Sequence, residues 1–244
     1  MSLESEIANL VSKTTDLITY FNGKKAVIDQ AVSAAVAAAP AISRNFFVDS
    51  QLGSDDNLGT QASPFKTFEA AIKATPKGGR ADVTLQRDYS LSAHVQLLGR
   101  KLMVRSENGT NRKITLNEFS VESDGSTTRR MGSFWQSEES SVELANVTLS
   151  LPASTAGEVG AYYALVFCSG ASAPAVNMLR LYSVAFELRG TFLGLLMGAG
   201  TSLFQLSLVG TSLPSALNGR IFPGVAAGTA SKDLSHITTN LATL

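Results

Sequence analysis

Six carboxylates in the middle of the chain could take part in acid–base chemistry on a glycosidic bond, a reaction that uses two carboxyl groups placed across the bond. These are Glu118, Glu122, Asp124, Glu138, Glu139 and Glu143. Glu138 and Glu139 are adjacent in a polar Gln-Ser-Glu-Glu-Ser-Ser run, which is more typical of a solvated loop than of a catalytic pair. The catalytic residues are therefore unknown, and the sequence leans against an enzyme.

Metal and cofactor sites are poorly supported by residue type and spacing. His94 and His236 have no companions at ligand spacing, and the Gly-rich stretches lack the Lys-Ser/Thr ending of a phosphate loop. A polar loop could ligate a cation, but turn formation explains its composition more simply; its members are Asp49, Asp55, Asp56 and Asn57. We expect no metal and no cofactor.

Flat aromatic rings and planar donors beside outward loops could contact a saccharide. The candidates for glycan contact are Arg129, Trp135, Tyr162 and Tyr163, although packing in the core is the more common role of such rings. The single cysteine, Cys168, follows an apolar run and is expected to be a buried small hydrophobe.

Composition narrows the classes of partner. The chain has 244 residues, of which 44% are hydrophobic, so it can bury a core. Twenty basic residues balance twenty acidic residues, so the chain has no net positive charge that would attract nucleic acid. No apolar run approaches the roughly 20 residues of a membrane span, and the N-terminus does not resemble a secretory signal. We expect neither nucleic-acid binding nor membrane insertion.

The first forty residues carry a coiled-coil seam, with apolar residues at alternating steps of four and three. Its members are Leu3, Ile7, Leu10, Thr14, Leu17, Phe21, Ile28, Ala31 and Ala35. Asn22-Gly23 interrupts it, so the helix could come as two segments, and Pro40 ends it. A rod this slender needs partners, whereas the alternative is one amphipathic helix packed on its own domain. The composition of the seam does not separate two strands from three.

A short helix is expected after a Gly/Asp/Asn loop. Ser63 would cap it and Pro64 would occupy its first position. Its apolar face is expected to cover the first coil of the strand-rich region on its C-terminal side, and it consists of Phe65, Phe68, Ala71 and Ile72.

Beyond Arg80 the hydrophobic period becomes two, which predicts short strands. Residues 142–151 match residues 179–188, and residues 204–213 repeat the pattern less closely. Offsets of 37 and 25 residues would suit stacked coils of two or three strands. A β-sandwich is the alternative.

The motif from Asp49 through Gly53-Ser54-Asp55, Asn57, Gly59-Thr60 and Pro64-Phe65 to Ala70-Ala71 resembles the opening of pectate-lyase-like β-helices. The resemblance is dense over about 25 residues and looser beyond. With a heptad stem directly before it, the chain is similar to bacteriophage tail fibres and tailspikes, which are typically homotrimers. The family includes both polysaccharide-degrading spikes and non-enzymatic fibres, so it leaves activity open.

The resemblance implies a mainly β fold: a single-stranded right-handed parallel β-helix, or solenoid, preceded by a trimeric α-helical coiled coil. Residues 1–42 would form the stem and virion attachment, residues 43–80 the loop and capping helix, and residues 81–244 the β-helix body. The expected function is a structural component of the phage virion, docked to tail or baseplate proteins, assembled in the host cytoplasm and contributing to binding of host surface polysaccharide. The alternative is a depolymerase tailspike, a glycosidase or lyase; a host-encoded adhesin is a third, weaker option.

Overall fold

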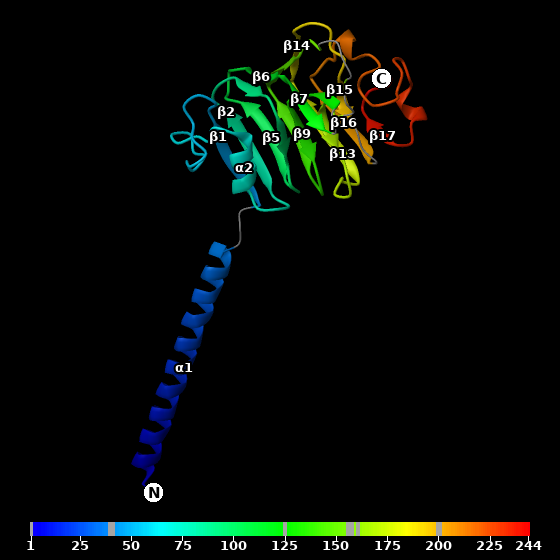
Figure 1. The fold of residues 1–244 in the computed structure, drawn as a ribbon. Helices are drawn as coiled ribbons and strands as arrows, with labels where there is room; N and C mark the ends of the chain where they lie inside the picture. The colour runs from blue at the N-terminus through cyan, green and yellow to red at the C-terminus, as the bar shows by residue number, and fades with distance from the viewer. Residues whose placement is uncertain (1, 39–41, 124–125, 155–158, 160–161, 199–201) are drawn as a thin grey trace. The chain divides into compact units, whose positions relative to one another are not determined.

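The computed structural model describes residues 2–38, 42–123, 126–154, 159, 162–198 and 202–244. Contacts between residues divide the chain into two compact units, residues 1–40 and residues 41–244 (Figure 1). The first unit is helical and the second is mainly β, with parallel sheets, as the sequence predicts.

The first unit is a single helix, α1 (Leu3–Ala38). It runs unbroken through Asn22-Gly23, so the expected division into two segments is wrong. One exposed glycine destabilises a helix by only about 1 kcal/mol relative to alanine. In a helix of 36 residues the other residues offset this cost. Its large apolar side chains are more than half exposed, from 54% for Ile7 and Leu17 to 73% for Leu3. The helix therefore has an apolar surface that no described residue of its own unit covers.

The second unit contains, within its described residues, three parallel sheets, one short antiparallel pair and three short helices. The seven-stranded sheet A consists of β1 (Ser43–Val48), β2 (Arg80–Leu85), β5 (Lys101–Ser106), β10 (Ser141–Ala145), β13 (Val176–Tyr182), β16 (Leu203–Val209) and β17 (Ile237–Thr239). Sheet B consists of β3 (Tyr89–Leu91), β6 (Arg112–Leu116), β11 (Val147–Leu151) and β14 (Ala185–Leu188). Sheet C consists of β4 (His94–Gln96), β9 (Ser133–Gln136), β12 (Ala164–Cys168) and β15 (Leu195–Gly198).

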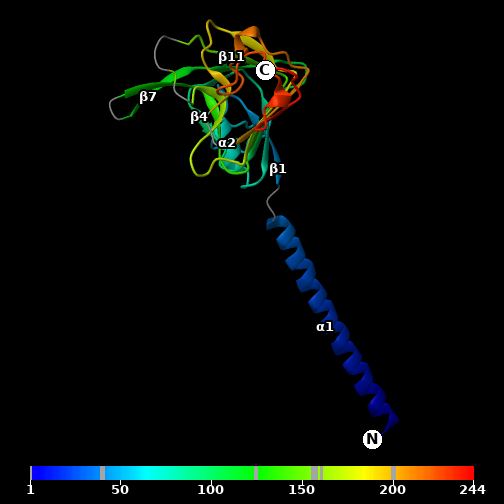
Figure 2. The same cartoon turned by 90° about the vertical axis from the view of Figure 1, so that its right-hand side faces the viewer.

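The chain visits the sheets in a fixed order, A then B then C, four times in succession from β2 to β15. Each strand pairs in parallel with the strand of the same sheet from the next round, as β2 does with β5 and β5 with β10. Between β6 and β9 the chain adds an antiparallel hairpin of β7 (Glu118–Ser123) and β8 (Ser126–Met131), which extends away from the parallel sheets in Figure 2. A hairpin was not predicted, although Asp124-Gly125 between two alternating runs is a hairpin signal.

Inward residues of successive strands stack into rows. The central row of sheet A is fully paired by register and buried, and it consists of Phe46, Val83, Val104, Leu144, Leu181 and Leu208. Burying one such aliphatic side chain contributes about 1.5–3 kcal/mol. These rows explain why the period-two pattern of the sequence produces one continuous core.

Of the two repeat alignments predicted from the sequence, one is correct and one is not. Val142 pairs with Leu179 and Leu151 with Leu188, so the first match is confirmed residue by residue. The second is wrong by two residues, because Leu181 pairs with Leu208 rather than with Leu206. A slip of two leaves every side chain on its original face, so the alternation in the sequence could not reveal the error.

A residue with left-handed backbone directly follows each of the sheet A strands β10, β13 and β16. Asn146 (φ 53°), Ser183 (φ 49°) and Gly210 (φ 58°) occupy the same place in successive rounds. The N–H of Asn146 donates to the carbonyl of Tyr182, and the N–H of Ser183 to that of Val209. A residue that tolerates positive φ is therefore required at this point of the round.

The corner can be tested at Asn146. We expect Asn146→Val to lower the free energy of unfolding by about 1–3 kcal/mol, because a β-branched residue is strained at positive φ. Asn146→Gly should be close to neutral, since Gly210 already serves at the equivalent corner. Urea denaturation of the two variants measures the difference, and equal losses would show that corner strain is not the cause.

The short helix α2 (Phe68–Ala74) begins later than predicted. Thr67, not Ser63, is the N-cap, and its side chain accepts from the N–H of Ala70 at 3.2 Å. Pro64 is not helical, because its carbonyl accepts from Ser54 and Asn57 in the preceding loop and Phe65 bridges to Val48. The buried apolar residues Phe65, Phe68, Ala71 and Ile72 belong to the core.

The other end of the unit is closed by irregular chain. The 3₁₀-helices η1 (Ser215–Leu217) and η2 (Ser231–Asp233) flank a segment in which Phe222 is buried against Phe204, with ring centroids 5.3 Å apart. Leu244 is also buried. The Ala/Gly/Thr-rich tail thus covers the last apolar residues of the sheets.

Candidate binding site on sheet C

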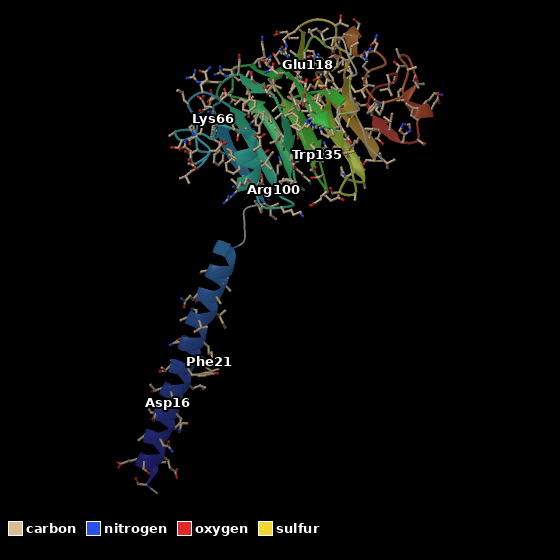
Figure 3. All side chains as sticks on the ribbon, in the orientation of Figure 1. Asp16, Phe21, Lys66, Arg100, Glu118 and Trp135 are labelled. Atoms are coloured by element: carbon tan, nitrogen blue, oxygen red, sulfur yellow. The ribbon has the colours of Figure 1, made fainter. Side chains whose placement is uncertain are left out.

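The outward face of sheet C carries an unusual concentration of aromatic rings. Trp135 of β9 and Phe167 of β12 are register neighbours and stack with centroids 5.7 Å apart and planes at 20°. Three further rings complete what we call the aromatic cluster, which consists of His94, Phe119, Trp135, Tyr162 and Phe167. Figure 3 marks Trp135 on these strands. Parallel register places the rings side by side, since residues two apart on a strand share a face.

The base of the hairpin covers part of this cluster. Phe119 of β7 meets the His94 ring edge to face at 4.9 Å, and Phe167 meets the same ring at 4.8 Å. The Arg130 guanidinium, on β8, lies 4.9 Å from the centre of the Tyr162 ring. A cation over an aromatic face is attractive by about 0.5–2 kcal/mol, so this contact holds the hairpin to the cluster.

The polar atoms of the cluster are only partly satisfied. His94 Nδ1 lies 2.6 Å from Ser133 Oγ, but His94 Nε2, Trp135 Nε1 and Arg130 Nε are buried without a hydrogen-bond partner among the described residues. Such atoms normally find partners. Burial and then the charge of Arg130 lower the pKa of His94 to about 4, so the imidazole is neutral near pH 7.

The lowered pKa predicts a loss of stability in acid. Between about pH 6.5 and about pH 4 the unfolded chain protonates His94 while the folded chain does not, so stability present above pH 6.5 falls as the pH falls. Thermal unfolding should show this slope in the wild type and a smaller one in His94→Phe. His236→Phe is the matched control, because His236 is exposed; an undiminished slope in His94→Phe would contradict the prediction.

A surface hollow of about 370 Å³ adjoins the cluster between α2 and β4. Its lining combines apolar and polar side chains from α2, β4 and the residues after β4; the lining residues are Glu69, Ile72, Lys73, His94, Gln96, Leu98 and Arg100. Gln96 is exposed and is the register neighbour of Trp135, so the hollow borders the cluster. Apolar walls with a few polar groups are typical of ligand sites.

The hairpin is anchored by a carboxylate network. Glu118 lies 3.4 Å from Arg129 and accepts the Tyr163 hydroxyl, which in turn accepts from Ser154 Oγ at 3.2 Å. Burial and the hydrogen bond to Glu118 raise the pKa of Tyr163, so its proton is retained. These contacts give Glu118, which is labelled in Figure 3, and Tyr163 a structural role at the base of the hairpin.

The four residues predicted to contact glycan differ in location and exposure. Trp135 and Tyr162 lie in the aromatic cluster and are partly exposed, whereas Tyr163 is 1% exposed and offers no free face. Arg129 is ion-paired with Glu118. Arg130, the sequence neighbour of Arg129, was also considered for saccharide contact and does lie at the cluster. Sequence reasoning missed His94, Phe119 and Phe167, which come from three strands. The only signal was their aromatic type, because their proximity depends on register.

The other five carboxylates considered for acid–base chemistry are ion-paired, exposed or outside the described residues. Glu138 pairs with Lys77 at 2.7 Å, and Glu143 lies 3.4 Å from Arg180. Glu122 and Glu139 are exposed, and Asp124 lies outside the described residues.

Asp49 and Asp55 hold the loop before α2 through its backbone. Asp49 accepts from the N–H groups of Gln51 and Leu52 and from Arg87, and Asp55 from those of Lys66 and Thr67. Burial works against ionisation of Asp49, but these hydrogen bonds outweigh it and lower its pKa.

Two further features concern the described part of the chain only. No three side chains among its His, Cys, Asp and Glu lie close enough to hold a metal ion. Its helices are too short or too polar to cross a membrane.

The predicted seam residues all lie on α1, where the side chains described from Leu3 to Ala31 are exposed; the Ala35 side chain lies outside the described residues. Cys168 is buried, with its sulfur 3.5 Å from Ser202 Oγ.

Comparison with known proteins gives no relative: no family model matches the sequence, and neither a curated protein nor a solved structure shows significant similarity.

Proposed function

We propose that this chain is a structural component of a phage tail fibre or tailspike, a homotrimer that docks to the tail or baseplate and contributes to binding of host surface polysaccharide. The observation that carries the proposal is a 36-residue helix whose large apolar residues are not covered by its own unit, followed in the chain by a unit of repeating parallel strands. Such a helix requires partner helices in water.

The stem would be a coiled coil of three copies. Leucines at Leu3, Leu10 and Leu17 with Ile7 facing them would also suit two strands. The seam, however, is wider than a two-stranded one needs, because apolar residues also occupy flanking heptad positions that are usually charged; these are Val11, Ile18, Tyr20, Val27 and Val32. A third helix would cover this wider surface.

The body would be a right-handed parallel β-helix. Support comes from the fixed order of sheets A, B and C, the parallel pairing of each strand with the next round, and the stacked inward rows. α2 would close the first coil through Phe68, whose ring centroid lies 4.1 Å from that of Tyr89 on β3, and the segment around Phe222 would close the last. Both ends of a stacked array need such covers.

Glycan binding would use the aromatic cluster and the neighbouring hollow. The partly exposed Trp135 and Tyr162 rings could lie against sugar faces, and Gln96, Lys73 and Arg100 supply hydrogen-bond donors. Three copies on one rigid particle would raise the avidity of a weak site by roughly 10² to 10⁴. The ion-paired state of Glu118, Glu138 and Glu143 favours binding over the alternative, a depolymerase.

Two measurements test the placement and the activity. Antibodies against the purified full chain should label the tails of phage particles by electron microscopy; label absent from intact particles would contradict a virion role. Incubation with host surface polysaccharide should release no reducing or unsaturated ends. Sustained turnover abolished by a Glu→Gln substitution would instead support the depolymerase.

The glycan site is tested by Trp135→Ala in the full-length protein. We expect binding to host surface polysaccharide to weaken by roughly 2- to 12-fold per site, the equivalent of about 0.5–1.5 kcal/mol of aromatic contact. Trp135→Phe, which keeps a flat ring, should retain most of the affinity. Biolayer interferometry on immobilised polysaccharide measures both, and unchanged binding by Trp135→Ala would exclude this surface.

A further inference from the structure

Three Asn-Gly pairs occur in the chain, and the structure places them in three different settings. They are Asn22-Gly23, Asn108-Gly109 and Asn218-Gly219. An asparagine followed by glycine is the dipeptide most prone to lose its side-chain amide, because glycine has no side chain to hinder attack by its own backbone nitrogen. The surroundings of each pair then decide whether the reaction can occur in the folded protein.

We infer that Asn108 is a site of spontaneous covalent modification, converting to aspartate and isoaspartate in the folded protein while Asn22 and Asn218 are protected. The Gly109 nitrogen attacks Cγ of Asn108, the Cγ–Nδ2 bond breaks, and ammonia leaves with the amide proton. Solvent water then opens the resulting imide. Opening at Cγ gives aspartate, and opening at the backbone carbonyl gives isoaspartate; nothing is oxidised or reduced.

Asn108 sits in an open turn on the surface. The N–H of Thr110 donates to the carbonyl of Glu107 at 3.0 Å, and Gly109 has φ 77°, which makes Asn108 and Gly109 the central residues of a type II turn. Asn108 is exposed, and no atom lies within 4 Å of the position a Gly109 side chain would occupy. The peptide plane between them therefore has room to rotate toward the attacking geometry.

Water reaches this turn from two sides. One hollow of about 400 Å³ and another of about 370 Å³ are both lined by Glu107 and Asn108. The turn also lies in the corner between β5 and β6, where the chain uses five residues, 107–111, whereas the next two rounds use one and two. A change in the turn therefore leaves the paired strands in place.

Asn218 is the matched comparison, because it is also exposed and its turn has the same hydrogen bond and the same positive φ at glycine. Asn218 has φ −61° and ψ 122°, Gly219 has φ 70°, and the N–H of Arg220 donates to the carbonyl of Leu217 at 2.9 Å. Here, however, the backbone nitrogen of Ala227 lies 3.2 Å from the position of a Gly219 side chain. The same turn is thus confined by neighbouring chain, which resists rotation of the peptide plane.

Asn22 is protected for a different reason. It lies inside α1, where each backbone N–H donates to the carbonyl four residues earlier. The Gly23 nitrogen is therefore held away from the Asn22 side chain, and reaction requires the helix to open first.

The test is incubation of the native full-length chain in mildly alkaline buffer, followed by tryptic digestion and mass spectrometry. The three sites fall in separate peptides, residues 14–24, 106–112 and 190–220. We expect the peptide 106–112 to gain one mass unit at Asn108, with both aspartate and isoaspartate products, at least roughly tenfold faster than the other two, since those require local opening. Asn108→Ser should abolish that gain.

A denatured sample provides the control for the fold. In concentrated urea the three sites should react at similar rates, because only the folded chain distinguishes them. Native rates at Asn218 or Asn22 that equal or exceed the rate at Asn108 would overturn the inference, as would differences that persist in urea. Neither result depends on a phage origin or on glycan binding.

Discussion

Leu10→Asp should reduce the protein from an assembly of three chains to a single chain. Leu10 is 68% exposed on α1 and lies at the centre of the apolar seam. In a three-helix stem the substitution would bring three carboxylates together in an apolar core, where an unpaired charge is strongly unfavourable. Sedimentation equilibrium or light scattering measures the change as a threefold loss of mass.

Ser12→Asp is the matched control for this experiment. It adds the same charge to the same helix, but residue 12 lies on the face opposite the seam. We expect Ser12→Asp to keep the mass of the wild type. A wild-type chain that is itself monomeric, or a Leu10→Asp variant that stays trimeric, would contradict the proposed stem.

Phe134→Ala should lower the free energy of unfolding by about 3–5 kcal/mol, the usual cost of removing a fully buried aromatic ring. Phe134 is 0% exposed and pairs with Val95 and Val166 on either side, so its ring fills the space between three rounds of the chain. The neighbouring strands are hydrogen-bonded in register and cannot close around the cavity. Urea denaturation at a fixed protein concentration measures the loss.

Trp135→Ala provides the comparison on the same strand. Trp135 points outward and is partly exposed, so its removal leaves no enclosed cavity and should cost much less than Phe134→Ala. Equal losses of unfolding free energy for the two variants would mean that the inward-facing residues of sheet C do not stabilise the fold more than the outward-facing ones. If the slope of the unfolding free energy against urea concentration is the same in the wild type and both variants, the substitutions have not changed the unfolded state.

The helix of the first unit was predictable because its signal is local. Residues three and four apart define one face of a helix whatever the rest of the chain does, and Leu3 to Phe21 follow this spacing. The seam was predicted to continue beyond Gly23, but whether the helix itself runs unbroken there was left open, since a single glycine signals either a break or a tolerated cost. The number of helices in the stem depends on contacts between chains, which no pattern within one chain fixes.

The aromatic cluster shows what the sequence did not reveal. Trp135 and Tyr162 were candidates by type, but Phe119, His94 and Phe167 join them only through a hairpin and a register. The predicted contact Tyr163 is the neighbour of Tyr162 in sequence and yet is buried, because its hydroxyl is bound to Glu118. Adjacent residues on extended chain can face opposite ways, so only the structure could separate them.

By itself the sequence determined the pairing of residues 142–151 with residues 179–188, because the apolar alternation and a polar residue before a valine repeat there at one spacing. It did not determine the register of the last repeat or the start of α2. Both depend on long-range hydrogen bonds: Leu208 pairs with Leu181, and Phe65 bridges to Val48 before the helix can begin. Local pattern fixes which face a residue takes, whereas contacts between distant segments fix which neighbour it meets there.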